Sequence, residues 1–229
     1  MNYKNFINNE WFDSDSGRTF EVVNPFTETV IAKVPASGKS DVDKAVRAAQ
    51  TAFKDWGTMT AGDRRDYLQA LAQKSLAHAD SLAKTISIEM GKPLKDAITE
   101  IEDLSEYLQY YSELARDQVG RIVSPVEERS MSLVRYEPYG VVGCILPWNY
   151  PLSLMGWKLA PALAAGNTII MKPSEITSTS LLHWAEIVGD IMPPGVLNVI
   201  TGYGTEAGEE IVKHPSIPII TFTGSVNTG

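Results

Sequence analysis

The sequence predicts an α/β fold in which helices flank a parallel sheet. Between residues 140 and 222, short apolar runs alternate with segments of helical periodicity. Each strand-helix-strand unit takes roughly 30 residues, the length of a βαβ crossover. The runs are apolar at nearly every residue, as expected for strands covered on both faces. Before this series, one segment interrupts the helical pattern, and its alternation predicts an extended hairpin arm.

The composition indicates a globular chain and excludes several kinds of partner. Of the 229 residues, 44% are hydrophobic and 21% are charged, which is enough to bury a sizeable core. The formal net charge of −8 repels a phosphate backbone, so nucleic acid is not expected as a partner. The single cysteine allows no internal disulfide, and neither a secretory signal nor an apolar run of membrane-spanning length is visible. We therefore expect a cytoplasmic protein with no membrane partner.

The first 117 residues predict short strands followed by helices. Ser40 is expected as the N-cap of the first helix, and a second helix follows Thr60, with Asp63 three residues on. The segment Gly91-Lys92-Pro93 ends one helix and begins a long amphipathic one. Strand patterns precede these helices at Phe6-Ile7, Trp11-Phe12, Val22-Val23 and residues 29–34.

Residues 118–138 predict the hairpin arm. Met131 and Leu133 alternate with Ser132 and Val134, as in a strand that has two distinct faces. Because this stretch interrupts the helical region, we interpret it as an extended hairpin arm.

Regular alternation resumes after residue 140. Strands are expected at residues 141–146, 168–171, 196–200 and 217–222, with helices at residues 153–165, 178–191 and 205–213. This order predicts a Rossmann-like sheet. After the last strand, the turn Thr223-Gly224-Ser225 calls for a further helix, so we expect that the last unit is truncated at Gly229.

Polar residues follow the first two strands of this series. Ligands of parallel sheets bind beyond the carboxyl ends of the strands. Asn149 lies in a turn held by two prolines and could donate to a developing oxyanion, although the residues alone favour a helix-capping role. Lys172 and Glu175 could hold the hydroxyls of a ribose, although the residues alone favour an exposed charged loop.

Glycines follow the third and fourth strands. Gly204 and Gly208 lie in one turn and Gly224 in the other, where backbone amides could approach a pyrophosphate. Neither turn has the G-x-G-x-x-G spacing of a dinucleotide fingerprint, so each is a weak signal by itself.

Taken together, five motifs resemble the N-terminal half of the aldehyde dehydrogenase superfamily, in order and at its spacing. The motifs are Pro147-Trp148-Asn149-Tyr150-Pro151, residues 159–167, Lys172-Pro173-Ser174-Glu175, Pro194-Gly195-Val196-Leu197-Asn198 and Phe222-Thr223-Gly224-Ser225. The likeness is strongest to the NAD-dependent general and betaine-type members. It implies oxidation of an aldehyde to a carboxylic acid through a cysteine thiohemiacetal and thioester. A coenzyme A-dependent, acylating dehydrogenase is a lesser alternative.

The resemblance implies a role for each matched position. Asn149 matches the asparagine that stabilises the oxyanion, and Tyr150 and Trp157 match positions that line the aldehyde tunnel. Aromatic residues there box a cationic group in the betaine- and amino-aldehyde members, although a general apolar tunnel is the simpler interpretation. The implied cofactor is NAD, with NADP as the alternative. The implied cofactor-binding residues are Ile145, Leu146, Pro147, Trp148, Lys172, Ser174, Glu175, Gly204, Gly208, Phe222, Thr223, Gly224 and Ser225.

The resemblance also implies a domain organisation. Residues 1–117 and 139–229 correspond to the cofactor-binding domain, and residues 118–138 to an arm that makes the protein a homo-oligomer. The catalytic domain, with its thiol and general base, would follow Gly229, so we expect that this chain alone is inactive and poorly stable. A non-catalytic nucleotide-binding module, or pseudoenzyme, is the alternative. After Ser225 the chain has Val226-Asn227 where the family often has Thr-Glu, a minor departure.

The remaining thiol and imidazoles predict no chemistry of their own. Cys144 lies inside an apolar strand and is expected to be a small buried hydrophobe. The three histidines, His78, His183 and His214, are far apart on helical surface patterns, so we expect structural roles and no metal site.

Overall fold

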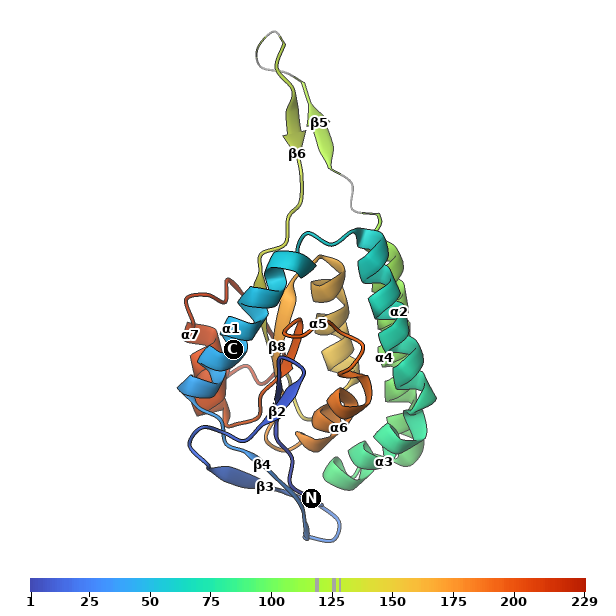
Figure 1. Ribbon diagram of the computed structural model, residues 1–229. Helices are drawn as coiled ribbons and strands as arrows, with labels where there is room; N and C mark the ends of the chain where they lie inside the picture. Colours follow the sequence, from blue (N-terminus) through green and yellow to red (C-terminus); the bar gives the residue numbers. More distant parts are fainter. Residues whose placement is uncertain (118–119, 125–126, 128) are drawn as a thin grey trace.

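The computed structural model describes residues 1–117, 120–124, 127 and 129–229. A six-stranded sheet lies between two layers of helices, and a narrow arm projects from one end (Figure 1). The strand order is β10-β7-β8-β9-β1-β2. This arrangement confirms the predicted α/β class with a parallel sheet and flanking helices.

The parallel part of the sheet consists of β7 (Val141–Ile145), β8 (Thr168–Lys172), β9 (Leu197–Val199) and β10 (Ile219–Phe222). β7 lies at its centre and pairs in parallel with both β8 and β10. In register, Ile145 is opposite Lys172 on one side and Phe222 on the other. The carboxyl ends of three strands therefore meet at one edge of the sheet.

The N-terminal hairpin makes the sheet mixed rather than wholly parallel. β1 (Asn5–Ile7) and β2 (Glu10–Phe12) pair with each other, and β1 also pairs antiparallel with β9. Asn8 and Asn9 form the connecting turn with φ angles of 56° and 60°, a left-handed conformation that asparagine tolerates. A separate ribbon follows, formed by β3 (Thr19–Val23) and β4 (Val30–Pro35).

Helices cover both faces of the sheet, which explains why its strands are apolar throughout. One face carries α1 (Lys39–Trp56) and α7 (Glu209–Lys213), and neighbouring strand residues such as Ile169 and Ile170 belong to opposite cores. The other face carries α2 (Ala61–Ala77), α3 (Ala79–Met90), α4 (Leu94–Leu114), α5 (Ser153–Ala164) and α6 (Thr179–Val188), as Figure 1 shows.

Two helix starts differ in how they are capped. The prediction of Ser40 as an N-cap was wrong, because α1 begins one residue earlier and Gly38 is the cap. Asp41 accepts a hydrogen bond from the Gly38 N–H at 3.0 Å, which supplies the cap from inside the helix. Thr60 does cap α2, since its hydroxyl accepts from the Asp63 N–H at 3.2 Å. The break at His78 that separates α2 from α3 was not predicted.

Helices α5 and α6 receive their caps from carboxylates of the neighbouring helical layer. Neither helix has a side-chain cap of its own. Glu100 of α4 accepts from two N–H groups at the start of α5, and Glu89 of α3 accepts from the Thr179 and Ser180 N–H groups of α6. Burial raises the pKa of Glu89 to about 7, although the hydrogen bonds from Thr179 and Ser180 act in the opposite direction.

The predicted arm contains an antiparallel pair of strands. β5 (Arg121–Val123) pairs with β6 (Ser132–Val134), with Ile122 opposite Leu133. Residues 118–119, 125–126 and 128 of the predicted arm lie outside the described residues. Because the chain enters β7 directly from the arm, the arm lies at the amino ends of the parallel strands, away from their carboxyl ends (Figure 1).

Candidate functional site

A cleft of about 610 Å³ lies at the carboxyl ends of β7 and β10. Five of the predicted cofactor residues line it, and they come from three strand ends and the turn after β9. They are Ile145, Glu175, Gly204, Gly208 and Phe222. The sheet topology therefore brings together residues that are up to 77 positions apart in the sequence and leaves space between them for a small molecule.

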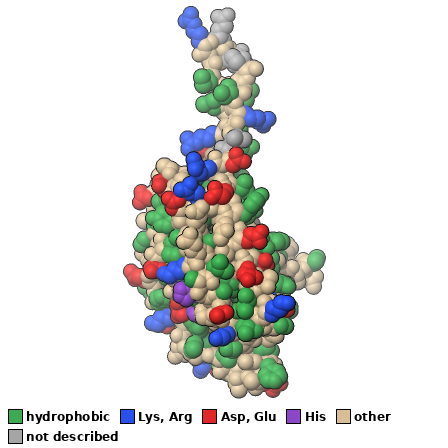
Figure 2. All heavy atoms as spheres, turned by 90° about the vertical axis from the view of Figure 1, so that its right-hand side faces the viewer, with side chains coloured by type: hydrophobic (Ala, Val, Ile, Leu, Met, Phe, Trp, Pro, Cys, Tyr) green, Lys and Arg blue, Asp and Glu red, His purple; other side chains and the backbone are tan. Residues whose placement is uncertain are grey.

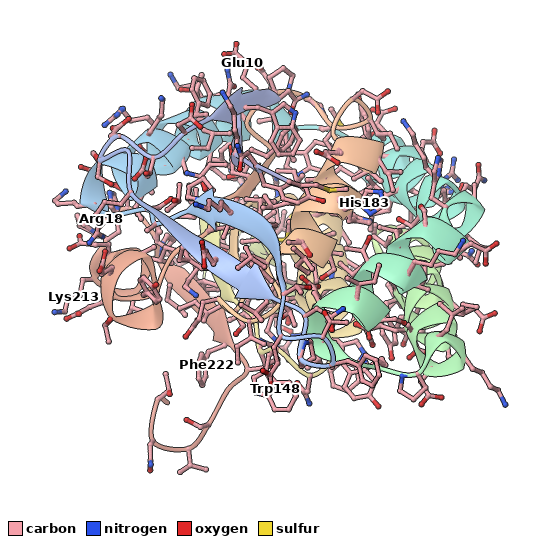
Figure 3. All side chains as sticks on the ribbon, turned by 90° about the horizontal axis from the view of Figure 1, so that it is seen from below. Glu10, Arg18, Trp148, His183, Lys213 and Phe222 are labelled. Atoms are coloured by element: carbon pink, nitrogen blue, oxygen red, sulfur yellow. The ribbon has the colours of Figure 1, made fainter. Side chains whose placement is uncertain are left out.

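The end of β7 presents the first predicted segment beside the cleft. Ile145 is opposite Phe222, and Leu146 extends the strand by donating its N–H to the Lys172 carbonyl at 3.0 Å. Pro147 then turns the chain outward. The Trp148 side chain, 52% exposed, lies at the same end of the molecule as Phe222 (Figure 3).

Asn149 lies in the turn between β7 and α5 and is exposed. It does not cap the helix, because the N-cap position is Leu152 and the capping oxygens belong to Glu100. Its side-chain amide makes no hydrogen bond within the described part of the chain. Its N–H groups are therefore available to an oxygen atom that approaches from solvent.

Lys172 is buried, which contradicts the interpretation of this segment as an exposed charged loop. Its side chain is 2% exposed, and its ammonium donates to the Pro173 carbonyl at 2.8 Å and lies 3.8 Å from the Glu175 carboxylate. Burial lowers the pKa of Lys172, and the charge of Glu175 partly offsets this effect. Glu175 is half-exposed at the rim of the cleft, and the Ser174 hydroxyl accepts from the Ile176 N–H at 3.3 Å.

The turn after β9 forms the floor of the cleft. The predicted helix at residues 205–213 begins as a π-helical turn, η1 (Gly204–Gly208), and continues as α7. A Cβ atom at Gly208 would lie 3.6 Å from the aliphatic stem of Lys172, so this turn packs closely on the end of β8. The glycine allows the backbone to reach that position without a side chain in the cleft.

The ribbon β3-β4 closes one side of the site, a position that the sequence analysis did not predict. Phe20 stacks against Tyr203 with ring centroids 5.2 Å apart, and Arg18 pairs with Glu206 of η1. Both contacts join segments that are more than 180 residues apart. A stacked pair and an ion pair of this kind depend on tertiary packing and leave no periodic pattern in the sequence.

Lys158 is a second residue that the sequence analysis missed. It lies in α5 and is 8% exposed, and its ammonium donates to the Thr223 hydroxyl at 2.5 Å. Burial lowers the pKa of Lys158. The signal that the sequence offered for Lys158 was a lysine on the sheet-facing side of an otherwise apolar helix. The contact fixes the Phe222–Ser225 turn, in which Ser225 also bonds to Thr228 through its hydroxyl.

The two predicted substrate residues have separate neighbours. Tyr150 is in the turn before α5 rather than on the helix, and the Lys92 ammonium lies 3.6 Å from its ring centroid. Trp157 is on α5 and meets Tyr107 edge-on, with centroids 5.7 Å apart. A groove of about 440 Å³ beside it is lined by Glu106, Tyr107, Tyr110, Tyr111 and Trp157.

The thiol and imidazoles lie outside the cleft. Cys144 is fully buried, as predicted, and burial raises the pKa of its thiol to about 12. His183 is half-buried rather than on a surface, and its ring is 2.9 Å from the Thr85 hydroxyl. Among the described residues, no three His, Cys, Asp or Glu side chains are grouped closely enough to hold a metal ion. Nor does any described helix have the length and apolar character needed to cross a bilayer.

Solved structures share this architecture over nearly the whole chain. Betaine aldehyde dehydrogenase (betB) from Staphylococcus aureus, solved in complex with NAD+, is 34% identical and superimposes with a TM-score of 0.95, covering 99% of this chain and 46% of that one. The structure of 3,6-anhydro-L-galactose dehydrogenase in complex with NAP is 35% identical, with a TM-score of 0.97, and covers 100% of this chain and 48% of that one.

Curated relatives agree with the structural likeness. Peroxisomal aminoaldehyde dehydrogenase 2 of Pisum sativum and betaine aldehyde dehydrogenase 1 of Oryza sativa subsp. japonica are each 43% identical over 233 residues, 98% of this chain. The chain spans about half the length of these relatives, 46% in each case. A model of the aldehyde dehydrogenase family matches residues 11–229. This chain therefore belongs to the aldehyde dehydrogenase family.

Proposed function

We propose that this chain forms the cofactor-binding part of an NAD(P)-dependent dehydrogenase that oxidises an aldehyde to a carboxylic acid. In this proposal, residues 1–117 and 139–229 bind the cofactor, and residues 118–138 join subunits. The observation that carries the proposal is the cleft at the carboxyl ends of β7 and β10, with the free amide of Asn149 on the turn that follows β7. A cytoplasmic location remains a prediction, because curated relatives include peroxisomal and chloroplastic proteins.

The cleft fits a dinucleotide in size and in chemistry. Gly204 and Gly208 leave the η1 side open to a flat or phosphorylated group, while Glu175 and the neighbouring Lys172 can bind ribose hydroxyls. Phe222 borders the same space, and Lys158 fixes the turn that follows it through Thr223. When bound, the nicotinamide accepts the hydride that leaves the substrate.

Asn149 would act on the substrate oxygen. When a thiolate adds to an aldehyde, the carbonyl oxygen becomes negatively charged, and a pre-positioned N–H donor stabilises that charge more than it stabilises the aldehyde. The thiolate cannot come from Cys144, since a buried thiol with a pKa of about 12 stays protonated at neutral pH. This chain would therefore contribute the cofactor-binding site and one oxyanion donor, and the nucleophile would come from elsewhere in the enzyme.

Replacing Asn149 with Ala should lower kcat of the active dehydrogenase by about 10²–10³-fold, the usual loss for one oxyanion donor. Steady-state NADH formation measures this, with Gln50→Ala, an exposed amide on α1, as the control. Unchanged turnover in Asn149→Ala would contradict the assignment. A non-catalytic nucleotide-binding module would instead bind NAD without oxidising any aldehyde in the wild type.

The enzyme should prefer NAD to NADP, because the carboxylate of Glu175 would face a 2′-phosphate, and two like charges in contact cost several kcal/mol. We expect kcat/KM with NAD to exceed that with NADP by at least about tenfold. Glu175→Gln should raise kcat/KM with NADP and so reduce the ratio of the two kcat/KM values. Equal or better use of NADP by the wild type would show that Glu175 does not contact the ribose.

The substrate proposed is an aldehyde that carries a cationic group. The groove at Trp157 combines four aromatic side chains with the carboxylate of Glu106, a lining that attracts a cation through both charge and ring quadrupoles. The relatives named for aminoaldehydes and betaine aldehyde give independent support.

A substrate panel tests this assignment. Amino- or trimethylammonium-aldehydes should have kcat/KM values roughly threefold to thirtyfold above those of aliphatic aldehydes of equal length, the range of a cation–π contact. Trp157→Ala should reduce that ratio and leave the aliphatic substrates nearly unaffected. If the wild type shows no preference, the interpretation as a general apolar tunnel holds instead.

The arm is proposed to join copies of the protein. Ile122 and Leu133 are 81% and 65% exposed, and hydrophobic side chains lie along the arm in Figure 2. The two-stranded ribbon also leaves unpaired edges, which favour pairing with another chain. Contact with a second copy would cover both the apolar side chains and the strand edges.

Ile122→Lys should shift the enzyme to smaller species in sedimentation velocity, because it places a charge in the proposed contact. Phe26→Lys makes the same change at an exposed apolar residue in the β3-β4 turn, far from the arm, and should leave the assembly intact. A wild-type enzyme that sediments as a monomer would exclude the oligomeric assignment.

A further inference from the structure

Lys92 is a buried cation in the connection between α3 and α4. Gly91, with a φ of 77°, ends α3 in a left-handed conformation, and Pro93 precedes α4, so Lys92 is held in a sharp turn. Its side chain is 7% exposed. The ammonium donates to the carbonyl of Asn149 at 2.8 Å and lies 3.6 Å from the ring centroid of Tyr150.

Glu100 completes the arrangement from α4. Its side chain is 0% exposed, and one carboxylate oxygen binds the Lys92 ammonium at 2.5 Å. The other oxygen accepts from the N–H groups of Leu152 and Ser153, at 2.8 and 3.1 Å. The ion pair thus contacts the chain on both sides of Tyr150.

The exposed part of the turn, residues 148–150, lies between Pro147 and the buried residues Pro151 and Leu152. Pro147 and Pro151 have no N–H to donate, and the side chains of Trp148 and Tyr150 are largely exposed. Burying two charges also costs free energy that apolar residues of similar size would not. Glu100 caps α5 and needs no lysine for that contact, so what Lys92 adds to the packing of α4 on α5 is its bond to the backbone of Asn149.

We infer that Lys92 and Glu100 are positioning residues that hold the Asn149 amide in the orientation needed to bind the oxyanion. The inference rests on the proposed catalytic role of Asn149. Lys92 fixes the backbone of Asn149 through its carbonyl, and Glu100 fixes the start of α5, so the side chain between them leaves the turn in one direction. Loss of the pair releases that backbone while Asn149 itself is still present.

The kinetic test is a double-mutant cycle in the active dehydrogenase. Lys92→Met keeps the apolar stem and removes the donor, and should lower kcat by roughly 10–100-fold, the effect of misplacing a catalytic group by about 1 Å. The KM for NAD should not change. In an Asn149→Ala background, Lys92→Met should cause little further loss, because the group it positions is gone. Lys92→Arg, which keeps a donor, should restore part of the turnover.

Several outcomes separate this inference from the proposed function. If Asn149→Ala has no effect, the proposed function fails. If Asn149→Ala lowers kcat and Lys92→Met does not, or if the two losses simply add, the positioning role is overturned and the function stands. Lys74→Met removes an exposed ion pair with Asp190 and serves as the matched control. If Lys92→Met does not fold, Glu100→Gln can replace it in the double-mutant cycle with Asn149→Ala, since it removes the charge that holds Lys92.

A structural measurement on the same active dehydrogenase is independent of turnover. In hydrogen exchange, Lys92→Met should speed exchange of the Leu152 and Ser153 amides and leave the amides of β8 protected. Unchanged exchange at Leu152 and Ser153 would overturn the inference, whatever the kinetics show.

Discussion

The parallel pairing of β7 with both β8 and β10 is the constraint on which the site depends. Parallel neighbours require crossovers that return each chain segment to the same end of the sheet, so every strand finishes at one edge. The register places Ile145, Lys172 and Phe222 side by side at that edge. The turns that follow must then share one space, and their glycines and the carboxylate of Glu175 line the cleft. A slip of the register by one residue would turn these side chains toward the helical layers.

Local patterns predicted most elements, because those patterns are set by nearest neighbours. The apolar runs correctly predicted β7, β8, β9 and β10, and Thr60 was correctly placed at the start of the second helix. Ser40 failed as a cap because the helix already begins at Lys39 after the cap residue Gly38, which leaves Ser40 inside the first turn. The pairing of β1 with β9 joins Phe6 to Val199 and has no local signature. It makes the sheet mixed, although the α/β class was right.

The motif residues of the site could be predicted from the sequence, but the buried charged residues that contact its turns could not. Motif resemblance pointed to Lys172 and Glu175, but only packing reveals that one is buried and the other lies at the rim. Lys158, Lys92 and Glu100 each occupy an ordinary helical or turn position in the sequence. Their partners are 52 to 65 residues away, so their roles arise from how α4 and α5 pack.

The carboxylates of Glu89 and Glu100 have a consequence for the order in which the chain acquires structure. Glu89 lies in α3 and Glu100 in α4, and both helices precede β7 and β8 in the chain. Even so, Glu100 accepts hydrogen bonds from the first amides of α5, and Glu89 accepts them from the first amides of α6. Until α5 and α6 pack on α3 and α4, their N-terminal N–H groups cannot bond to these two carboxylates. The acceptors for both crossover helices are therefore synthesised before the helices themselves and before the strand ends that line the cleft.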